Sequence, residues 1–358
     1  GPFTPILQEA QRRRALRLRL YVAGSHLSPA HGLTVTDIET AGWPIAARIS
    51  TVTDDTARGI GASMALALGG FSMAWEHLKP DVILVLGDRF ETFCAVAAAQ
   101  PFRLPVVHLH GGEATEGLYD EAFRHAITKM SHLHLVSTGW AAQRVRALGE
   151  EAWRVQVVGA PGLDGIAEFR PIPRDEATFL PTGKFLLVVQ HPETLSGEPA
   201  QGVLAISRAL RQIGLPFLWV GPGADRGWEL TAANADGALG TYIGHLPRPQ
   251  FWTAMAHAEA LVGNSSAGII EAASFGLPVV NVGDRQQGRL RHVNVVDVSA
   301  ESAAIARAIQ AQAGLRPMLD HYGPNPYGDG HASPRICDAL EALEITDRLL
   351  KKRLEAPQ

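Results

Sequence analysis

Residues 81–129 read DVILVLGDRFETFCAVAAAQPFRLPVVHLHGGEATEGLYDEAFRHAITK, and the fold class can be predicted from this stretch. Two short apolar runs, 82–86 and 106–109, have the length of strands, and the small apolar residues between them predict a helix packed closely on a sheet. Strand, helix and strand in this order form a parallel crossover unit. Because open parallel sheets bind ligands beyond the carboxyl ends of their strands, we expect the chemistry in the segments that follow the two runs.

Titratable residues gather where these two predicted strands end. They are Asp88, Arg89, Glu91, His110 and Glu113. Carboxylates at such a position can serve as general acid and base when burial raises their pKa. His108, His110, Glu113 and His125 together could suggest a metal site, but a His-x-His pattern without a clear third ligand is a weak signal. We expect no metal.

A predicted helix that begins at Asp120 and Glu121 adds two more carboxylates. Arg124 and His125 lie four residues after them, so each pair shares a helix face. One interpretation is an ordinary capped helix with intrahelical ion pairs, and the other is a set of acid and base groups at the sheet edge. The residues alone leave both interpretations open.

Length, charge and cysteine content limit the class of protein. A chain of 358 residues suits two domains. The net charge of −4 argues against a nucleic-acid binder, which needs a basic surplus. Cys94 and Cys337 are set among apolar residues, which predicts two buried free thiols and is consistent with a reducing cytoplasm. No apolar run is long enough to span a membrane.

The second half of the chain restarts the strand and helix pattern after a proline-rich stretch at 165–183. We expect domains at residues 1–168 and 169–332, and a long final helix over 333–354 within a C-terminal segment 333–358. The first domain is expected to lack its opening strand, because the chain starts with a helical pattern where a doubly wound domain normally starts with a strand.

The most informative motif of the second half is GNSSAGIIE at 263–271. Small residues and two hydroxyls leave a strand and enter a helix predicted over 269–275, a pattern typical of an anion site, while Glu271 could hold vicinal hydroxyls such as those of a ribose. An ordinary turn with a serine N-cap explains the motif equally well. Arg285 follows a later strand and could bind phosphate, although arginines in such a loop often form only a solvated surface.

Many motifs together closely resemble the hydrolysing UDP-N-acetylglucosamine 2-epimerases of bacterial sialic-acid and legionaminic-acid pathways. The matching strings cover the chain almost end to end: GSHLSPAHG, LKPD, GDRFE, HLHGGEATEG, DEAFRHAITKMSHLH, VGAPGLD, QHP, GNSSAGIIEAASFG, GDRQQGR and YGDGHASPRI. The resemblance implies a GT-B fold, with two Rossmann-like α/β domains, parallel sheets, a ligand cleft between them and a final helix that crosses back to the first domain. It also implies a cytoplasmic homodimer or homotetramer that uses no cofactor and no metal.

The resemblance also assigns roles to residues. It implies loss of UDP from C1 by elimination across C1–C2, followed by hydration to N-acetylmannosamine. The implied catalytic residues are Asp88, Asp120, Glu121, Arg89 and His191. The implied substrate-binding residues are His26, His110, Glu113, Ser265, Ser266, Gly268, Glu271, Arg285 and His245, with the serines and Arg285 on the diphosphate and Glu271 on the ribose.

Other functions remain open at this point. The same chemistry could act on a GDP-linked sugar or on a 2,4-diacetamido-6-deoxy sugar, because no residue settles the base or the substituents at C4 and C6. A GT-B glycosyltransferase and a non-catalytic nucleotide-sugar binding protein are further alternatives. His110 stands where animal members carry glutamate and bacterial members carry histidine, which favours a bacterial-type enzyme. The family's opening Gly-Thr-Arg-type motif, with its arginine near the phosphates, has no counterpart here.

Overall fold

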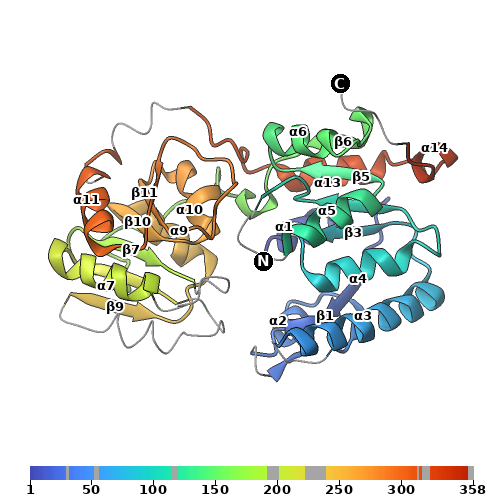
Figure 1. Ribbon diagram of the computed structural model, residues 1–358, viewed down its shortest axis with the longest axis horizontal. Coiled ribbons are helices and arrows are strands. Elements are labelled where there is room, and N and C mark those ends of the chain that lie inside the picture. The colour runs from blue at the N-terminus through green and yellow to red at the C-terminus, as the bar shows by residue number, and fades with distance from the viewer. Residues whose placement is uncertain are drawn as a thin grey trace. The chain divides into compact units, whose positions relative to one another are not determined.

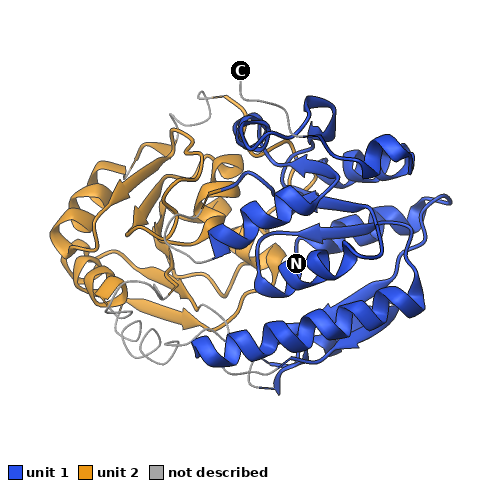
Figure 2. Ribbon diagram, turned by 45° about the vertical axis from the view of Figure 1, so that its right-hand side comes forward, with its two compact units in different colours: residues 1–113, 119–164, 330–358 blue, residues 114–118, 165–329 orange. Residues whose placement is uncertain are grey.

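The computed structural model describes residues 1–29, 32–51, 56–114, 120–191, 201–221, 239–312, 314–316 and 323–353. The chain divides into two compact α/β units (Figure 2). Unit 1 comprises residues 1–113, 119–164 and 330–358, and unit 2 comprises residues 114–118 and 165–329. Each unit is built around its own parallel strands and hydrophobic clusters.

Within the described residues, the strands of unit 1 form two parallel sheets (Figure 1). The smaller sheet pairs β1 (Leu20–Ala23) with β2 (Ile45–Ile49). The larger has the order β3-β4-β5-β6, with the bounds β3 (Ile83–Leu86), β4 (Val106–Leu109), β5 (Leu133–Val136) and β6 (Val155–Val157). Among the described residues, no hydrogen-bonded strand pairing joins β1 to β3, so the two sheets are separate.

Helices pack on both of these sheets. The α-helices of unit 1 are α1 (Phe3–Arg12), α2 (Val35–Thr40), α3 (Ala57–Leu78), α4 (Phe90–Ala99), α5 (Asp120–Met130), α6 (Gly139–Ala147), α13 (Ala332–Glu341) and α14 (Asp347–Leu350). Short 3₁₀ turns are η1 (Gly24–Leu27), η3 (Ala152–Arg154) and η4 (Pro161–Leu163). The crossover from β3 through α4 to β4, predicted from the opening stretch, is confirmed.

The long final helix expected over 333–354 is wrong, because the structure breaks it into α13 and α14. The break has a local cause at Thr346, whose side chain accepts a 3.3 Å hydrogen bond from the backbone N–H of Leu349. This is an N-cap, so the threonine starts a new helix instead of continuing the old one.

Unit 2 is organised around one six-stranded parallel sheet. Its order is β12-β11-β10-β7-β8-β9, with the bounds β7 (Leu186–Val189), β8 (Phe217–Val220), β9 (Gly240–Ile243), β10 (Ala260–Gly263), β11 (Val279–Val282) and β12 (Val295–Val298). Its helices are α7 (Gln201–Ile213), α9 (Arg248–His257), α10 (Ser266–Ile270), α11 (Ser302–Gln312) and the 3₁₀ helix η5 (Ala272–Phe275).

Both faces of this sheet are buried. Successive residues of a strand point to opposite faces, so Leu187 packs in a cluster with Trp252 of α9, while Leu186 packs in a second cluster with α7 and α11. Strands covered on both sides read as continuous apolar runs, which is why the sequence LLVV of β7 shows no alternation. Because both faces are covered by apolar clusters, polar residues lie at the ends of the strands.

Candidate active site

The turn after β3 presents Asp88. Gly87 precedes it with φ +81°, a conformation that favours glycine, and its carbonyl accepts a 2.8 Å hydrogen bond from Nε2 of His108. Since a carbonyl only accepts, Nε2 carries the proton. Burial lowers the pKa of His108 to about 3, so the ring is neutral. His108 thus holds the turn before Asp88, which explains this histidine without a metal.

Arg124 on α5 joins the carboxylates of this region. Its side chain is only 1% exposed, and its guanidinium donates hydrogen bonds to Asp88, to Glu121 and, at 2.9 Å, to the carbonyl oxygen of Glu113. The sequence suggested only a pairing with Asp120 along the helix. Arg124 instead ties the end of β3 and the segment after β4 to the first turn of α5.

Asp120, the first residue of α5, has a raised pKa. The pKa of Asp120 is raised to about 6: burial is the largest cause and the charge of Asp88 adds to it, while the positive charges of Arg89 and Arg124 oppose the shift. These contributions place Asp120 close to Asp88. A carboxyl group with such a pKa can both give and take a proton near neutral pH.

Glu121 is paired with three basic side chains. Besides Arg124, it contacts Nε2 of His125 at 3.2 Å and the guanidinium of Arg144 at 3.2 Å. The pair that the sequence predicted between Glu121 and His125 is therefore confirmed. Glu121 is held in place by these pairs, whereas Asp120 makes no such pair among the interactions that the structure gives for it.

The turn from His110 to Glu113 directly follows β4. His110 has φ +61°, an uncommon conformation for a residue with a Cβ, and its Nδ1 lies 3.6 Å from Oε1 of Glu113. Glu113 is buried and accepts a hydrogen bond from Ser137. A Cβ on Gly112 would lie 2.3 Å from the carbonyl oxygen of Ala141, so the turn requires glycine there.

The end of β1 reaches the start of α4. Glu91 is buried and bonds Arg89 at 3.1 Å, and a Cβ on Gly24 would lie 2.1 Å from the Glu91 carboxylate. Burial and the charge of Arg89 lower the pKa of His26, while Glu91 opposes this shift. The ring Nδ1 of His26 lies 2.7 Å from the hydroxyl of Thr34. The structure thus brings His26, Arg89 and Glu91, which come from two separate motifs, close together.

In unit 2, Asn264 fixes the backbone of His191. Asn264 is fully buried at the carboxyl end of β10; its Oδ1 accepts a 2.7 Å hydrogen bond from the N–H of His191, and its Nδ2 donates to the His191 carbonyl at 2.9 Å. The carbonyl of Asn264 accepts from Arg285 at 3.2 Å and Gln286 at 2.8 Å. Asn264 and Gln286 stand in the motifs GNSSAGIIE and GDRQQGR, but the sequence assigned them no role; their place after apolar strands was the available signal.

In the GNSSAGIIE motif, one serine caps a helix and one glycine allows close packing, whereas the sequence pattern also suggested an anion site. The helix predicted over 269–275 is present with different bounds: α10 starts earlier, at Ser266, and gives way at Glu271 to the 3₁₀ helix η5. Ser265 caps α10 by accepting from the N–H of Ala267 at 3.3 Å, and Ser266 is half-buried behind it. Gly268 is buried, and a Cβ there would lie 3.0 Å from Val279. Its smallness serves close packing of helix on sheet.

Glu271 points at an indole. Its carboxylate accepts a hydrogen bond from Nε1 of Trp252, and burial raises its pKa against that bond and the charge of Arg248. The guanidinium of Arg248 lies 4.1 Å from the centre of the Trp252 ring. His245 is exposed beyond the end of β9, two strands from β7 in the sheet order.

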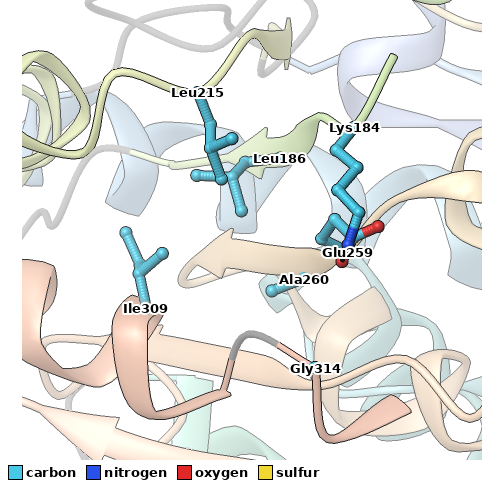
Figure 3. Close-up of a pocket in the computed structure, with 7 residues that line it drawn as sticks. All are labelled: Lys184, Leu186, Leu215, Glu259, Ala260, Ile309 and Gly314. Carbon is cyan, nitrogen blue, oxygen red and sulfur yellow. Dashed lines mark hydrogen bonds and ion pairs between the residues drawn. The ribbon is translucent and has the colours of Figure 1, made fainter. Parts of the chain in front are cut away.

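A small cavity of unit 2 lies at the opposite ends of these strands. Its volume is about 250 Å³, and it opens beside Leu186 and Ala260, the first residues of β7 and β10 (Figure 3). Lys184 and Glu259 line it and pair at 3.3 Å. Since the predicted residues follow the strands, this cavity is not part of the candidate site.

The described part of the chain contains no group of three or more histidine, cysteine or acidic residues placed to hold a metal ion. Among its helices, none is both long and apolar enough to cross a membrane. Cys94 and Cys337 are both buried and free, as the sequence predicted.

Comparisons with known proteins identify the family. A family model described as UDP-N-acetylglucosamine 2-epimerase matches residues 8–341. The chain is 37% identical to a UDP-N,N'-diacetylbacillosamine 2-epimerase (hydrolyzing) of Legionella pneumophila, over 98% of this chain and 95% of that protein. It is 33% identical to a GDP/UDP-N,N'-diacetylbacillosamine 2-epimerase (hydrolyzing) of Campylobacter jejuni, over 82% and 79% of the two chains.

The fold has solved counterparts. The UDP-N-acetylglucosamine 2-epimerase of Neisseria meningitidis, solved bound to UDP-N-acetylglucosamine, superposes with a TM-score of 0.77 at 17% identity, covering 95% of each chain. This likeness supports the expected GT-B-type fold of two α/β domains with parallel sheets. Together with the match of the family model over most of the sequence, it shows that the chain belongs to the UDP-N-acetylglucosamine 2-epimerase family.

Proposed function

We propose that this protein is a hydrolysing 2-epimerase that converts a UDP-linked 2-acetamido sugar into UDP and the free sugar inverted at C2. The observation that carries the proposal is the pair Asp88 and Asp120, with the pKa of Asp120 raised to about 6 beside an ion-paired partner. Removal of the weakly acidic C2 proton needs a base, while C1 becomes cationic as UDP departs. Two neighbouring carboxyl groups, one held in an ion pair and one that can take up a proton near neutral pH, suit both needs.

The roles follow from how each residue is held. Asp88 is held in an ion pair with Arg124, and its carboxylate is assigned to stabilise positive charge at C1. Asp120, with a pKa near 6, is mostly ionised at neutral pH but protonates easily, so it exchanges a proton with C2 or with the leaving oxygen. In unit 2, Ser265, Ser266 and Arg285 are assigned to the diphosphate, His191 to the departing phosphate and Glu271 to the ribose.

The relatives guide the choice of sugar. Two relatives above 30% identity are named for N,N'-diacetylbacillosamine as the sugar, one with UDP alone and one with GDP or UDP. We therefore place UDP-N,N'-diacetylbacillosamine before UDP-N-acetylglucosamine as the substrate. A GDP-linked donor is the third choice.

Proton NMR in deuterium oxide tests the proposal with each of the three donors in turn. Elimination and hydration predict a free sugar inverted at C2 that carries deuterium at that carbon, together with released nucleotide. Release only in the presence of an acceptor sugar would instead indicate a glycosyltransferase. Tight UDP binding without release from any donor would indicate a binding protein.

A further inference from the structure

A buried ionic cluster lies at the end of α5 opposite to Asp120. Glu150, which follows α6, is 1% exposed and pairs with Nζ of Lys129 at 2.6 Å and with Nζ of Lys352 at 2.7 Å. Nε2 of His134 lies 3.0 Å from the same carboxylate. Burial alone would raise the pKa of Glu150, but these three hydrogen bonds lower it to about 2, so the group is an anion at neutral pH. The proposed reaction uses none of these groups.

Lys352 also caps the end of α5. Its Nζ donates to the carbonyl oxygens of Lys129 at 2.8 Å and Ser131 at 2.6 Å, and it lies 3.3 Å from that of Thr128. The last carbonyls of a helix have no partner within the helix, and a positive charge beside them is also favourable to the helix dipole. One ammonium group therefore closes the helix whose first turn carries Asp120.

Arg154 holds the backbone of the segment that carries Lys352. Its side chain is fully buried and donates to the carbonyl oxygens of Arg348 and Leu349, both at 2.8 Å. These two residues belong to α14, just before Lys352 (Figure 1). A third hydrogen bond from Arg154, to the carbonyl of His132 at 3.0 Å, reaches the residue before β5. The segment is therefore docked on unit 1 through its backbone as well as through Lys352.

Thr128 connects this end of α5 with the turn before Asp88. Thr128 is fully buried, and its hydroxyl lies 3.4 Å from Nδ1 of His108. Because Nε2 of His108 donates its proton to the Gly87 carbonyl, Nδ1 can only accept, so the threonine hydroxyl donates. Space around this contact is tight, since a Cβ on Gly111 would lie 2.9 Å from Nδ1 of His108. A shift at the end of α5 would therefore disturb the turn before Asp88.

We propose that Lys352 is a positioning residue, which fixes the end of α5 and so keeps Asp120 and Arg124 in the geometry that the reaction needs. The proposal rests on the proposed function, because both of these residues stand on α5. A rigid helix of 11 residues, about 16 Å long, cannot shift at its last turn without moving its first. The match to the family model ends at residue 341, so family membership gives this segment no role.

Steady-state kinetics of Lys352→Met tests the proposal, with the donor that the NMR experiment identifies. The variant keeps an aliphatic stem but loses the charge and the donors. We expect kcat to fall about tenfold, because small displacements of catalytic groups slow a reaction steeply, while KM and the dissociation constant of UDP stay within about threefold. Lys351→Met is the matched control, since Lys351 is 70% exposed and pairs with an exposed Asp347, and it should keep the wild-type kcat. A near-normal kcat in Lys352→Met, or equal losses of kcat and UDP affinity, would overturn the proposal.

Amide hydrogen exchange measures the state of α5 without relying on turnover. In Lys352→Met, the amides of the last turn of α5 should exchange at least about fivefold faster, because the end of the helix loses its cap. Lys351→Met should exchange like wild type. If the wild-type protein turns over none of the three donors, the proposed function fails, and the exchange result still decides whether Lys352 fixes α5. Unchanged exchange in Lys352→Met overturns the proposal in either case.

The pH dependence of kcat in Lys352→Arg gives a second test, which also serves if Lys352→Met does not fold. Burial lowers the pKa of Lys352 to about 8, although Glu150 opposes the shift. The other charged or titratable groups that face Lys352 are Lys129, Arg154, His132 and His134. Burial lowers the pKa of both histidines, so neither changes its charge above pH 7.

An arginine at position 352 keeps its positive charge where the lysine loses it. The kcat of wild-type protein should therefore fall as the pH rises above about 8, and this fall should be smaller in Lys352→Arg. At pH 7, where both side chains are charged, the kcat of Lys352→Arg should lie within about threefold of wild type. Identical pH profiles in the two proteins would overturn the proposal, because the charge of Lys352 would then have no part in the reaction.

Discussion

The polar residues of unit 1 and of unit 2 both follow parallel strands, yet they are held in different ways. In unit 1, charged side chains hold one another: Arg124 is buried between Asp88 and Glu121, and Asp120 stands beside them with a raised pKa. In unit 2, a neutral amide holds the backbone, because Asn264 bonds both the N–H and the carbonyl of His191.

The difference suggests that unit 1 carries the reaction and unit 2 holds the nucleotide. A group that must change its charge during a reaction needs neighbouring charges that set its pKa. A surface that only holds a polyanion needs donors at fixed positions, which a neutral scaffold supplies without altering the charge of the ligand. Changes in unit 1 should therefore affect turnover, whereas changes in unit 2 should affect nucleotide affinity.

The largest expected effect is on turnover, in Asp88→Asn and Asp120→Asn. Each removes a carboxylate from the proposed reaction, so kcat should fall by about 10²–10⁴-fold. The dissociation constant of UDP, measured by calorimetry, should stay within about threefold of wild type because neither residue is assigned to the nucleotide. A variant that keeps near-normal kcat would remove its residue from the mechanism.

The pH dependence of Asp120→Asn gives a second reading of the same site. With a pKa of about 6 in the folded protein against a usual 3.8, wild-type Asp120 binds more protons when folded than when unfolded between these values. The ionised form therefore destabilises the fold, and stability falls as pH rises through this window. Asp120→Asn should raise Tm above pH 6 and lose this advantage near pH 4. An equal gain at both pH values would contradict the raised pKa.

The next effect is on stability, at Arg124. Arg124→Met leaves Asp88 and Glu121 without their shared buried cation, which should cost at least about 3 kcal/mol of unfolding free energy. Arg144→Met is the matched control, since Arg144 is 30% exposed and makes one 3.2 Å contact with the same Glu121; its cost should stay below about 1 kcal/mol. Denaturant unfolding followed by circular dichroism compares the two.

If Arg124→Met does not fold, Arg124→Lys can be used instead, because it keeps one positive charge. The effects of this variant on kcat and on UDP affinity can then be compared. Its single ammonium cannot serve Asp88, Glu121 and the Glu113 carbonyl together, so kcat should fall while UDP affinity is kept. Equal losses in kcat and UDP affinity would mean that the two units are not specialised as proposed.

Sequence periodicity predicted most of the strands because a buried parallel strand reads as a short apolar run. It also placed Asp88 directly after an apolar run and Asp120 at the start of a helix, while their assignment as acid and base came from the family resemblance and stays a prediction. Two elements were missed. β2 (IAARI) is interrupted by Arg48, and α11 was overlooked because its many alanines give a weak helical stripe. The separation of β1 and β2 from the larger sheet depends on pairing between distant residues.

The role of Arg124 could not be predicted from spacing. Helical periodicity names only partners three or four residues away, whereas the Asp88 that Arg124 binds lies 36 residues earlier on another element. His108 was considered with metal ligands because a histidine pattern does not show which atom faces a carbonyl. Ser265 shows the converse case, since the ordinary N-cap interpretation is correct and still leaves its proposed phosphate role to be tested.

A smaller effect is expected on nucleotide affinity from Asn264→Ala. The change leaves the N–H and carbonyl of His191 without their buried partner, which should weaken UDP binding by about tenfold. Asn294→Ala is the control, because Asn294 is equally buried and bonds the Leu277 carbonyl at 2.8 Å, next to the amino end of β12. Both variants should lose similar stability, but only Asn264→Ala should lose UDP affinity in calorimetric titration.

The smallest expected effect concerns Glu271 and the ribose. Glu271→Gln keeps an acceptor for the indole of Trp252 but removes the charge, so UDP binding should weaken by only about fivefold, or roughly 1 kcal/mol. 2'-Deoxy-UDP makes the test specific. Wild-type protein should bind this analogue about fivefold more weakly than UDP, and Glu271→Gln should bind the two nucleotides alike, because the lost hydroxyl and the lost charge belong to the same contact. Additive losses would place the ribose elsewhere and leave Glu271 as a partner of Trp252 alone.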